Sequence, residues 1–449
     1  MASSYTANSS PANGSLVSSA LVDSNLAVST ALQVKVLVLR GGGGHYSTYL
    51  ALKASLAAHH PHWQLAPVFV DSLGVAQSDP TGETTLAESL SQAIGTRSDK
   101  FYDFILKNGF GWVHLFTLHL HKLITWLKHS IDVALLVQRW QQQPPDLVLS
   151  VVPFHNRALA ESLKQAKLNV PVVTILTDFA DSPPAYWAAP QTQNYLLCPT
   201  QKAASQAIAQ GVLPERVIKT SGLVIHPHFY KPQVQNIAAA REQLGLVANR
   251  MTALVFFGAN GSDTMLKIAN KLVPLGDRLQ LIFLCGRNQK VATQLNQIVD
   301  NYQQKESQQK ENLRKENPQK IAVVEFTSEV SHYMHLSDFF IGKPGNVSIS
   351  EAVAMQLPLI VERNLLTLNQ ERYAADWIEA HQIGLTVSTF RDIYKGVNDM
   401  IKPDNFVHYQ ANLKRFQNRA VFEVPQVLEK ILDEGSKKSA NEQTIEFSC

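Results

Sequence analysis

The sequence of 449 residues is poor in cysteine and lacks the patterns that usually organise it. Its three cysteines, Cys198, Cys285 and Cys449, lie far apart and form no CxxC pair. This spacing argues against a disulfide framework and against a cysteine-rich zinc site. Such sparse use of cysteine fits a reducing cytoplasm.

The sequence also lacks long apolar runs, cationic residues near its start and a large net charge. No apolar run approaches the roughly 18 residues of a spanning helix, so no membrane-crossing segment is expected. Residues 1–33 are rich in Ser, Ala and Thr and contain no Lys or Arg, so we interpret them as a disordered tail rather than a targeting peptide. The net charge of +3 argues against a general nucleic-acid binder, because phosphate binding needs a clustered excess of cations.

Short β-branched apolar runs alternate with helical stretches along the chain. Alternation of this kind predicts parallel, doubly wound sheets with helices on both faces. We therefore expect an α/β protein with two Rossmann-like domains that face an interdomain cleft. The first series of expected strands is 34–39, 67–70, 147–152, 172–176 and 195–197, and the second is 252–257, 279–285, 321–326, 338–341 and 359–361.

The same pattern divides the chain into segments. The polar stretch 301–320 is expected to be a solvated helix extension or a disordered insertion. The predicted segments are a tail at 1–33, an N-terminal Rossmann-like domain at 34–229, a linker at 230–250, a C-terminal Rossmann-like domain at 251–400, helices at 401–434 that pack back on the N-terminal domain, and a tail at 435–449.

A run of four glycines and a histidine, Gly41 to His45, follows the first expected strand and precedes a helix. Free backbone N–H groups at a helix N-terminus bind phosphate well. Imidazole suits general-base work near neutral pH. The spacing leaves open whether His45 is catalytic or whether the turn only cradles a phosphate.

Two later loops repeat the order of strand, glycine loop and helix. Gly258 to Ser262 can either hold a phosphate or simply turn the chain. In the run from Lys343 to Ala352, a serine can hydrogen-bond a diphosphate at the helix N-terminus. A glutamate one turn later can accept both hydroxyls of a ribose, or can serve as a helix-cap carboxylate.

A third loop places Gln370 and Glu371 after the strand at 359–361. These side chains suit the hydroxyls of a sugar, although a solvated loop is the competing interpretation. No Asp-x-Asp motif, the usual clamp for a metal-bound diphosphate, occurs in the sequence. We therefore predict chemistry without a metal or other cofactor, in which backbone dipoles stabilise the leaving group.

Residues 101–140 combine apolar, aromatic and cationic side chains at helical spacing. The pattern is typical of a core helix. It is also typical of a helix that lies on an anionic bilayer, and the segment is too polar to span one.

Together, these motifs resemble the family of monogalactosyldiacylglycerol synthases and processive diacylglycerol glucosyltransferases, relatives of the enzyme that adds N-acetylglucosamine to make lipid II. The resemblance covers roughly residues 34–383. The segments that support it are Gly41–His45, Thr177–Asp181, Tyr186–Trp187, Gly222–Pro227, Cys285–Asn288, Lys343–Ala352 and Gln370–Glu371.

The resemblance implies a GT-B glycosyltransferase fold and an inverting transfer from a UDP-hexose, galactose or glucose, to diacylglycerol. It further implies an acceptor site in the N-terminal domain and peripheral attachment to a membrane. His45 would be the catalytic base, and Asp178 would orient it or shape the acceptor site. The other implied site residues are Gly42, Gly43 and Gly44 in the phosphate or acceptor loop; Gly258, Gly261, Ser262, Arg287, Phe326, Gly345, Asn346, Ser348, Glu351, Gln370 and Glu371 for the donor; and Trp112, Phe116, Lys122, Trp126 and Trp187 for the membrane or acceptor.

Three departures from the family pattern matter, and the last two of them touch the sugar pocket, so the choice between galactose and glucose stays open. Val224 replaces a signature proline, Ala374 stands where plant members carry Asn, and no Pro-Gly precedes Gln370. Three alternative functions remain: transfer to a different lipid or soluble acceptor, epimerisation of a UDP-sugar, and binding of a UDP-sugar without catalysis.

Overall fold

The computed structural model describes residues 31–39, 43–71, 74–75, 111–182, 184–231, 234–276, 278–310, 320–365 and 367–446, although it does not describe the side chains of 71, 74–75, 111–125, 305–310 and 436–446. The expected tail therefore lies outside the described residues up to position 30. Gly42 and the first part of the 101–140 stretch also lie outside them. Both sheets belong to one compact unit, Leu32–Cys449.

The first sheet is built around β1, whose β-branched residues are buried among its neighbours. Its strand order is β3-β2-β1-β4-β5-β6-β7, and all neighbours are parallel except β3, which runs antiparallel to β2. The strands are β1 (Leu32–Leu39), β2 (Trp63–Asp71), β3 (Gly74–Val75), β4 (Leu147–Ser150), β5 (Val172–Ile175), β6 (Tyr195–Cys198) and β7 (Val217–Lys219).

The second sheet is entirely parallel, in the order β10-β9-β8-β11-β12-β13. Neighbouring residues of β8 belong to different hydrophobic clusters, Leu254 to one and Val255 to the other, so both faces of this sheet are covered. The strands are β8 (Thr252–Phe256), β9 (Gln280–Leu284), β10 (Ile321–Val324), β11 (Phe339–Gly342), β12 (Leu359–Glu362) and β13 (Gly384–Val387).

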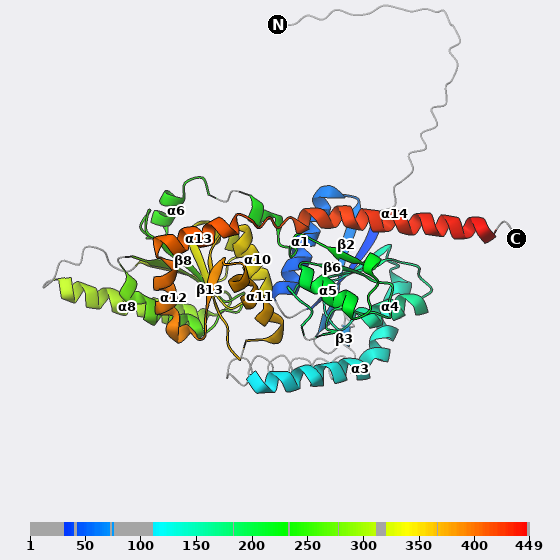
Figure 1. The fold of residues 1–449 in the computed structure, drawn as a ribbon, viewed down its shortest axis with the longest axis horizontal. Coiled ribbons are helices and arrows are strands. Elements are labelled where there is room, and N and C mark those ends of the chain that lie inside the picture. The colour runs from blue at the N-terminus through cyan, green and yellow to red at the C-terminus, as the bar shows by residue number, and fades with distance from the viewer. Residues whose placement is uncertain are drawn as a thin grey trace, which may run out of the picture. The chain divides into compact units, whose positions relative to one another are not determined.

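Helices connect most successive strands, except β2 to β3 and β5 to β6, and flank both sheets, which confirms the predicted α/β fold with two Rossmann-like sheets (Figure 1). We call the two parts of the molecule the first-sheet half and the second-sheet half. The helices are α1 (Gly43–His59), α3 (Gly111–Gln142), α4 (Asn156–Gln165), α5 (Gln201–Ala209), α6 (Ile237–Gln243), α7 (Thr264–Leu272), α8 (Gln289–Lys310), α9 (Val330–His335), α10 (Asn346–Ala354), α11 (Asn369–Ala380), α12 (Ile393–Met400), α13 (Pro403–Leu413) and α14 (Ala420–Glu446).

The last helix, α14, returns to the first-sheet half and lies beside α1 (Figure 1). Its buried residues Val421, Val424 and Leu428 share a hydrophobic cluster with β1 and β4. The segment that leads into α14 is hydrogen-bonded to the segment that leaves the first sheet. Asn418 Nδ2 donates to the Leu223 carbonyl at 2.8 Å, and the Arg419 N–H donates to Ser221 Oγ at 2.6 Å.

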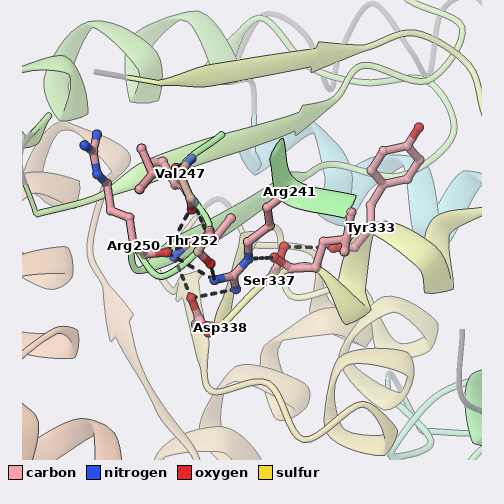
Figure 2. Close-up of polar contacts among 10 residues, drawn as sticks. Arg241, Val247, Arg250, Thr252, Tyr333, Ser337 and Asp338 are labelled. Atoms are coloured by element: carbon pink, nitrogen blue, oxygen red, sulfur yellow. Dashed lines mark hydrogen bonds and ion pairs between the residues drawn. The ribbon is translucent and has the colours of Figure 1, made fainter. Parts of the chain in front are cut away.

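The segment predicted as a linker contains α6 and is fixed to the second-sheet half. Figure 2 shows the buried side chain of Arg241 in α6 among polar groups of that half. Its guanidinium donates to Asp338 at 3.0 Å and to the Leu336 carbonyl at 2.9 Å. The same Asp338 oxygen accepts from the Thr252 N–H at 2.7 Å, which ties the start of β8 to the approach to β11.

The structure differs from the sequence expectations at the shortest and most polar elements. Strands β3, β7 and β13 were not predicted, and β1 begins at Leu32, inside the expected tail. Residues 435–446, expected to be a loose tail, continue α14 as a helix.

Candidate active site

His45 lies in the first turn of α1, directly after the glycine run that follows β1. Its Nδ1 is 2.7 Å from the Val151 carbonyl and 3.1 Å from Thr177 Oγ1. Because a carbonyl can only accept, Nδ1 carries the hydrogen and Nε2 keeps its lone pair. Burial lowers the pKa of His45 to about 4, although the bond to Val151 opposes this effect. The ring is therefore a neutral base of fixed tautomer at physiological pH.

The glycine turn before His45 touches loops of the second-sheet half. A Cβ placed on Gly44 would lie 3.3 Å from Val347 Cγ2, and one on Gly43 would lie 3.9 Å from the Cβ of Ala259. Ala259 follows β8, and Val347 lies in the first turn of α10. The carboxyl ends of both sheets thus meet beside His45, which is where ligands bind in doubly wound folds.

Asp178 does not hydrogen-bond His45, and orienting His45 was one of the two roles predicted for it. Its buried carboxylate accepts from Trp187 Nε1 at 2.8 Å through one oxygen and from Asn346 Nδ2 at 2.7 Å through the other. No bond joins it to His45, whose Nδ1 is held by Val151 and Thr177. Asp178 therefore does not orient the base directly.

The pKa of Asp178 reflects this enclosed position. The pKa of Asp178 is raised to about 7, and burial is the largest cause. The carboxylates of Glu371 and Asp181 also raise it, whereas the bonds from Trp187 and Asn346 lower it. The carboxyl group consequently titrates in the physiological range.

The predicted membrane or acceptor residues fall into two groups. Trp187 is only 1 % exposed, and its ring centroid lies 6.1 Å from that of His45, so it is an internal support rather than a lipid contact. Trp126 in α3 is 70 % exposed. The side chains of Trp112, Phe116 and Lys122 lie outside the described residues, although the backbone there belongs to α3.

The loops after β8 and β9 pack backbone against backbone. A Cβ on Gly261 would collide with the Cys285 carbonyl, and one on Gly286 would collide with the Ala259 carbonyl. Gly258 and Gly261 also adopt positive φ angles of 82° and 58°, which favour glycine. Ser262 Oγ accepts from the Thr264 N–H at 3.2 Å at the start of α7.

Beyond these loops, a pocket opens between the ends of β8 and β9 and residues 325–330. The Arg287 guanidinium lies 4.6 Å from the ring centroid of Phe326, and that ring is 55 % exposed. The pair offers a planar, partly cationic surface of the kind that stacks with a heterocycle.

The first turn of α10 lies opposite the glycine turn before His45, where Val347 approaches Gly44. Gly345 precedes this helix, and its N-terminus has no side-chain cap, so the N–H groups of Asn346, Val347 and Ser348 lack helical partners. Glu351 follows one turn later and is buried. Burial raises its pKa to about 8, and no described residue forms a hydrogen bond or ion pair with its carboxyl group.

The predicted sugar-facing pair opens α11. Glu371 forms an ion pair of 2.7 Å with Lys343, which lies between β11 and α10, and this contact raises the pKa of Lys343. The side-chain oxygen of Gln370 is buried without a hydrogen-bond partner among the described residues. An acceptor buried in this way is costly without a ligand. The buried carboxyl group of Glu351 belongs to the same half.

Sequence patterns did not reveal how these groups are held. Val151 fixes His45 through a backbone carbonyl, which no side-chain motif reports. Thr177 and Lys343 lie inside recognised motifs, but their contacts to His45 and Glu371 are seen only in three dimensions.

Comparison with known families indicates the class of enzyme to which this site belongs. The profile described as "Monogalactosyldiacylglycerol (MGDG) synthase" matches residues 82–225, and that of the "Glycosyltransferase family 28 C-terminal domain" matches residues 252–421. These ranges together include more than half of the chain. The chain belongs to glycosyltransferase family 28. This assignment confirms the resemblance drawn from the motifs, and it does not favour the epimerase alternative.

Two curated relatives of this family 28 glycosyltransferase carry the names of the family that its motifs resemble. It is 25 % identical over 416 residues to the chloroplastic monogalactosyldiacylglycerol synthase of Spinacia oleracea, covering 89 % of this chain and 72 % of that protein. It is 23 % identical over 274 residues to the processive diacylglycerol beta-glucosyltransferase of Staphylococcus carnosus, covering 60 % of this chain and 63 % of that one.

Solved structures show that the glycosyltransferase has the GT-B fold. It superposes on Acinetobacter baumannii MurG with a TM-score of 0.54 and 10 % identity, covering 89 % and 99 % of the two chains. For Anabaena Alr3699/HepE in complex with UDP, the TM-score is 0.52 and the identity 14 %, with coverage of 90 % and 100 %. A UDP-N-acetylglucosamine 2-epimerase also matches, with a TM-score of 0.50, 12 % identity and coverage of 90 % and 97 %. These likenesses describe the fold alone.

Proposed function

We propose that this glycosyltransferase moves a hexose from a UDP-hexose to the free hydroxyl of 1,2-diacylglycerol, with inversion at the anomeric carbon. The main support is the position of His45, a neutral base. It directly follows Gly43 and Gly44, which lie against Ala259 and Val347 of the second-sheet half. Diacylglycerol enters the proposal because the names of both quoted relatives include it.

In the proposed reaction, Nε2 of His45 accepts the proton of the lipid hydroxyl as its oxygen attacks the anomeric carbon. The glycosidic bond forms on one face of the sugar while the bond to UDP breaks on the other, and UDP leaves with the electron pair. The free N–H groups at the start of α10 and the hydroxyl of Ser348 stabilise the negative charge of the diphosphate.

The donor would be held by buried acceptors of the second-sheet half. Glu351 accepts from the ribose hydroxyls, and Gln370 accepts from a hydroxyl of the sugar. The base stacks near Phe326 and Arg287. HepE, a structure of the same fold, was solved in complex with UDP, which supports a UDP-linked donor.

The proposed transfer uses no metal and no other cofactor. Lys343, which is 2.7 Å from Glu371 and next to the N-terminus of α10, supplies positive charge near the leaving diphosphate. We expect full activity in EDTA.

The acceptor side would rest on a membrane through α3. Among the described residues, no helix has the length and apolarity needed to cross a bilayer. Trp126, Leu127 and Ile131 are 70 %, 62 % and 54 % exposed. We propose that they insert into the surface of an anionic membrane, which would give a cytoplasmic protein with peripheral attachment.

Replacing these three residues together, W126S/L127S/I131S, is expected to lower the fraction bound to anionic vesicles by about tenfold or more, because three apolar anchors are lost. Sedimentation with vesicles measures the effect. Val407→Ser, which removes a 63 % exposed side chain from α13, is the matched control and should bind like the wild type. Equal binding of the triple variant would contradict a role for α3.

The test of the function is an assay of purified protein with diacylglycerol vesicles in EDTA and, in separate reactions, labelled UDP-galactose, UDP-glucose and UDP-N-acetylglucosamine. Label in a glycosylated diacylglycerol is the expected result, and the donor that works identifies the sugar. Label that stays in water with every donor would reject diacylglycerol as the acceptor. Transfer to another lipid or to a soluble glycan would then support the second candidate.

A further inference from the structure

The two halves contact each other through side chains that lie close in the sequence to the predicted site residues Asp178 and Gln370. The Phe179 ring, after β5, stacks on Trp377 of α11 with centroids 5.0 Å apart and an interplanar angle of 19°. Lys202 Nζ of α5 lies 4.1 Å from the ring centroid of Tyr373, also in α11. Helix α11, which carries the predicted sugar-facing pair Gln370 and Glu371 in its first turn, is therefore also the helix that contacts the first-sheet half.

Asn346 lies at the centre of this interface. Its Nδ2 donates to Asp178 at 2.7 Å and to the Gln370 carbonyl at 3.3 Å, and its Oδ1 lies 3.5 Å from the Phe179 N–H. All the polar atoms of this buried side chain are thus turned toward protein groups. This placement differs from the donor contact that the sequence motif implied for Asn346.

The same interface continues to the base. Thr177, which precedes Asp178, is bonded to His45 at 3.1 Å. Trp187, which donates to Asp178, is itself fixed because its backbone N–H donates to Asp181 at 3.0 Å. A continuous series of contacts therefore runs from His45 through Asp178 and Asn346 to Gln370.

We propose that the Asp178–Asn346 hydrogen bond is an interdomain latch that sets the position of the Gln370–Glu371 turn relative to His45. Asp178 and Asn346 are then positioning residues rather than contacts to the donor. This inference rests on the proposed function, because it assigns the attacking group to one half and the donor sugar to the other. A misplacement of about 1 Å between such groups costs about a hundredfold in rate.

The latch is sensitive to charge. The charged groups that face Asp178 are Glu371, which is paired with Lys343, and Asp181. Protonation of Asp178 would place an O–H opposite a donor, either Trp187 Nε1 or Asn346 Nδ2, and one bond of the latch would be lost. Since the pKa of Asp178 is about 7, we expect the wild-type kcat to fall as the pH drops below 7.

The test is a swap of the two side chains. N346D places two carboxylates face to face, and we expect kcat to fall about 10- to 100-fold while the Kd for UDP stays within about threefold. In the double variant D178N/N346D the amide and the carboxylate exchange places, which restores the donor–acceptor pair but not the donation to the Gln370 carbonyl. The kcat of the double variant should therefore recover partly, to about threefold or more above that of N346D. D178N alone should show, at every pH, the low rate that the wild type has at pH 6.

Asn412→Ala is the matched control, because Asn412 is a buried asparagine that donates to the Gln382 carbonyl within the second-sheet half. It should leave kcat and its pH profile unchanged. A large loss of UDP affinity in N346D, or no recovery in the double variant, would overturn the latch. Hydrogen exchange provides a readout independent of activity: N346D should speed amide exchange in residues 177–182 and 369–377. Unchanged exchange would also reject the latch, whereas faster exchange in a protein that transfers no sugar would reject only the proposed function.

Discussion

Replacing His45 with alanine is expected to lower kcat for lipid glycosylation by about 100- to 10,000-fold, the range typical of a lost general base. The ring is neutral because burial lowers its pKa to about 4, and its Nδ1 hydrogen is committed to the Val151 carbonyl. The remaining lone pair on Nε2 is the group that the substitution removes. Label transfer from the UDP-hexose under saturating donor measures kcat, and titration with UDP should show affinity within about twofold of the wild type.

His59→Ala is the matched control for this prediction. His59 lies in the last turn of the same helix, and its Nδ1 is likewise held by a backbone carbonyl, that of Ser55, at 2.8 Å. Its removal should leave kcat unchanged. Turnover of the His45 variant at the wild-type rate would mean that another group accepts the proton.

The second large effect is expected at Glu351. Replacing it with glutamine should weaken the binding of a UDP-hexose about 10- to 100-fold, because a hydrogen bond to a charged acceptor is lost in a buried site. The carboxyl group has a pKa raised to about 8 by burial and no partner among the described residues. Calorimetric titration with the UDP-hexose gives the affinity directly.

The raised pKa of Glu351 makes the same binding depend on pH. Below pH 8 the free carboxyl group is mostly protonated, and binding to ribose hydroxyls requires the carboxylate, so binding releases a proton. Affinity should therefore rise by up to about tenfold per pH unit below pH 8 and level off above it, and the E351Q variant should lose this dependence. A UDP-hexose is the proper probe because free UDP has a phosphate that titrates near pH 6.

Glu362→Gln serves as the control for Glu351. Glu362 ends β12 in the same half and already accepts from the Phe390 N–H at 3.2 Å. The Glu362→Gln substitution is therefore expected to leave the affinity for the UDP-hexose and its pH dependence unchanged. If both glutamates had equal effects, the assignment of Glu351 to the ribose would fail.

The sequence predicted the strands best where the residues of the strand itself show a clear apolar pattern. Strands such as β1 and β8 are largely apolar runs buried on both faces, and the sequence indicated them within a few residues. Strand β7, with three residues that are exposed or only partly buried, and strand β13, which begins with glycine, offer too few apolar residues for such a pattern.

The site shows the same division. His45 and Glu351 could be placed because each follows a strand and opens a helix, so topology brings them to the cleft. The hydrogen bond between Asp178 and Asn346 could not be predicted, because Asn346 lies 168 residues away and belongs to the second-sheet half. The burial of Trp187 also depends on residues outside its own motif, because its ring packs in a cluster with Leu176 and Leu196 and its Nε1 donates to Asp178.

The return of α14 to the first-sheet half has a mechanical consequence. The chain crosses between the halves twice, and the two crossings are bonded to each other where Asn418 meets Leu223 and Arg419 meets Ser221. A Cβ on Gly222 would press against the side chain of Asn418, so the crossings lie in close contact there. The two crossings therefore cannot shift independently, because a displacement of either one would break the hydrogen bonds that hold it to the other.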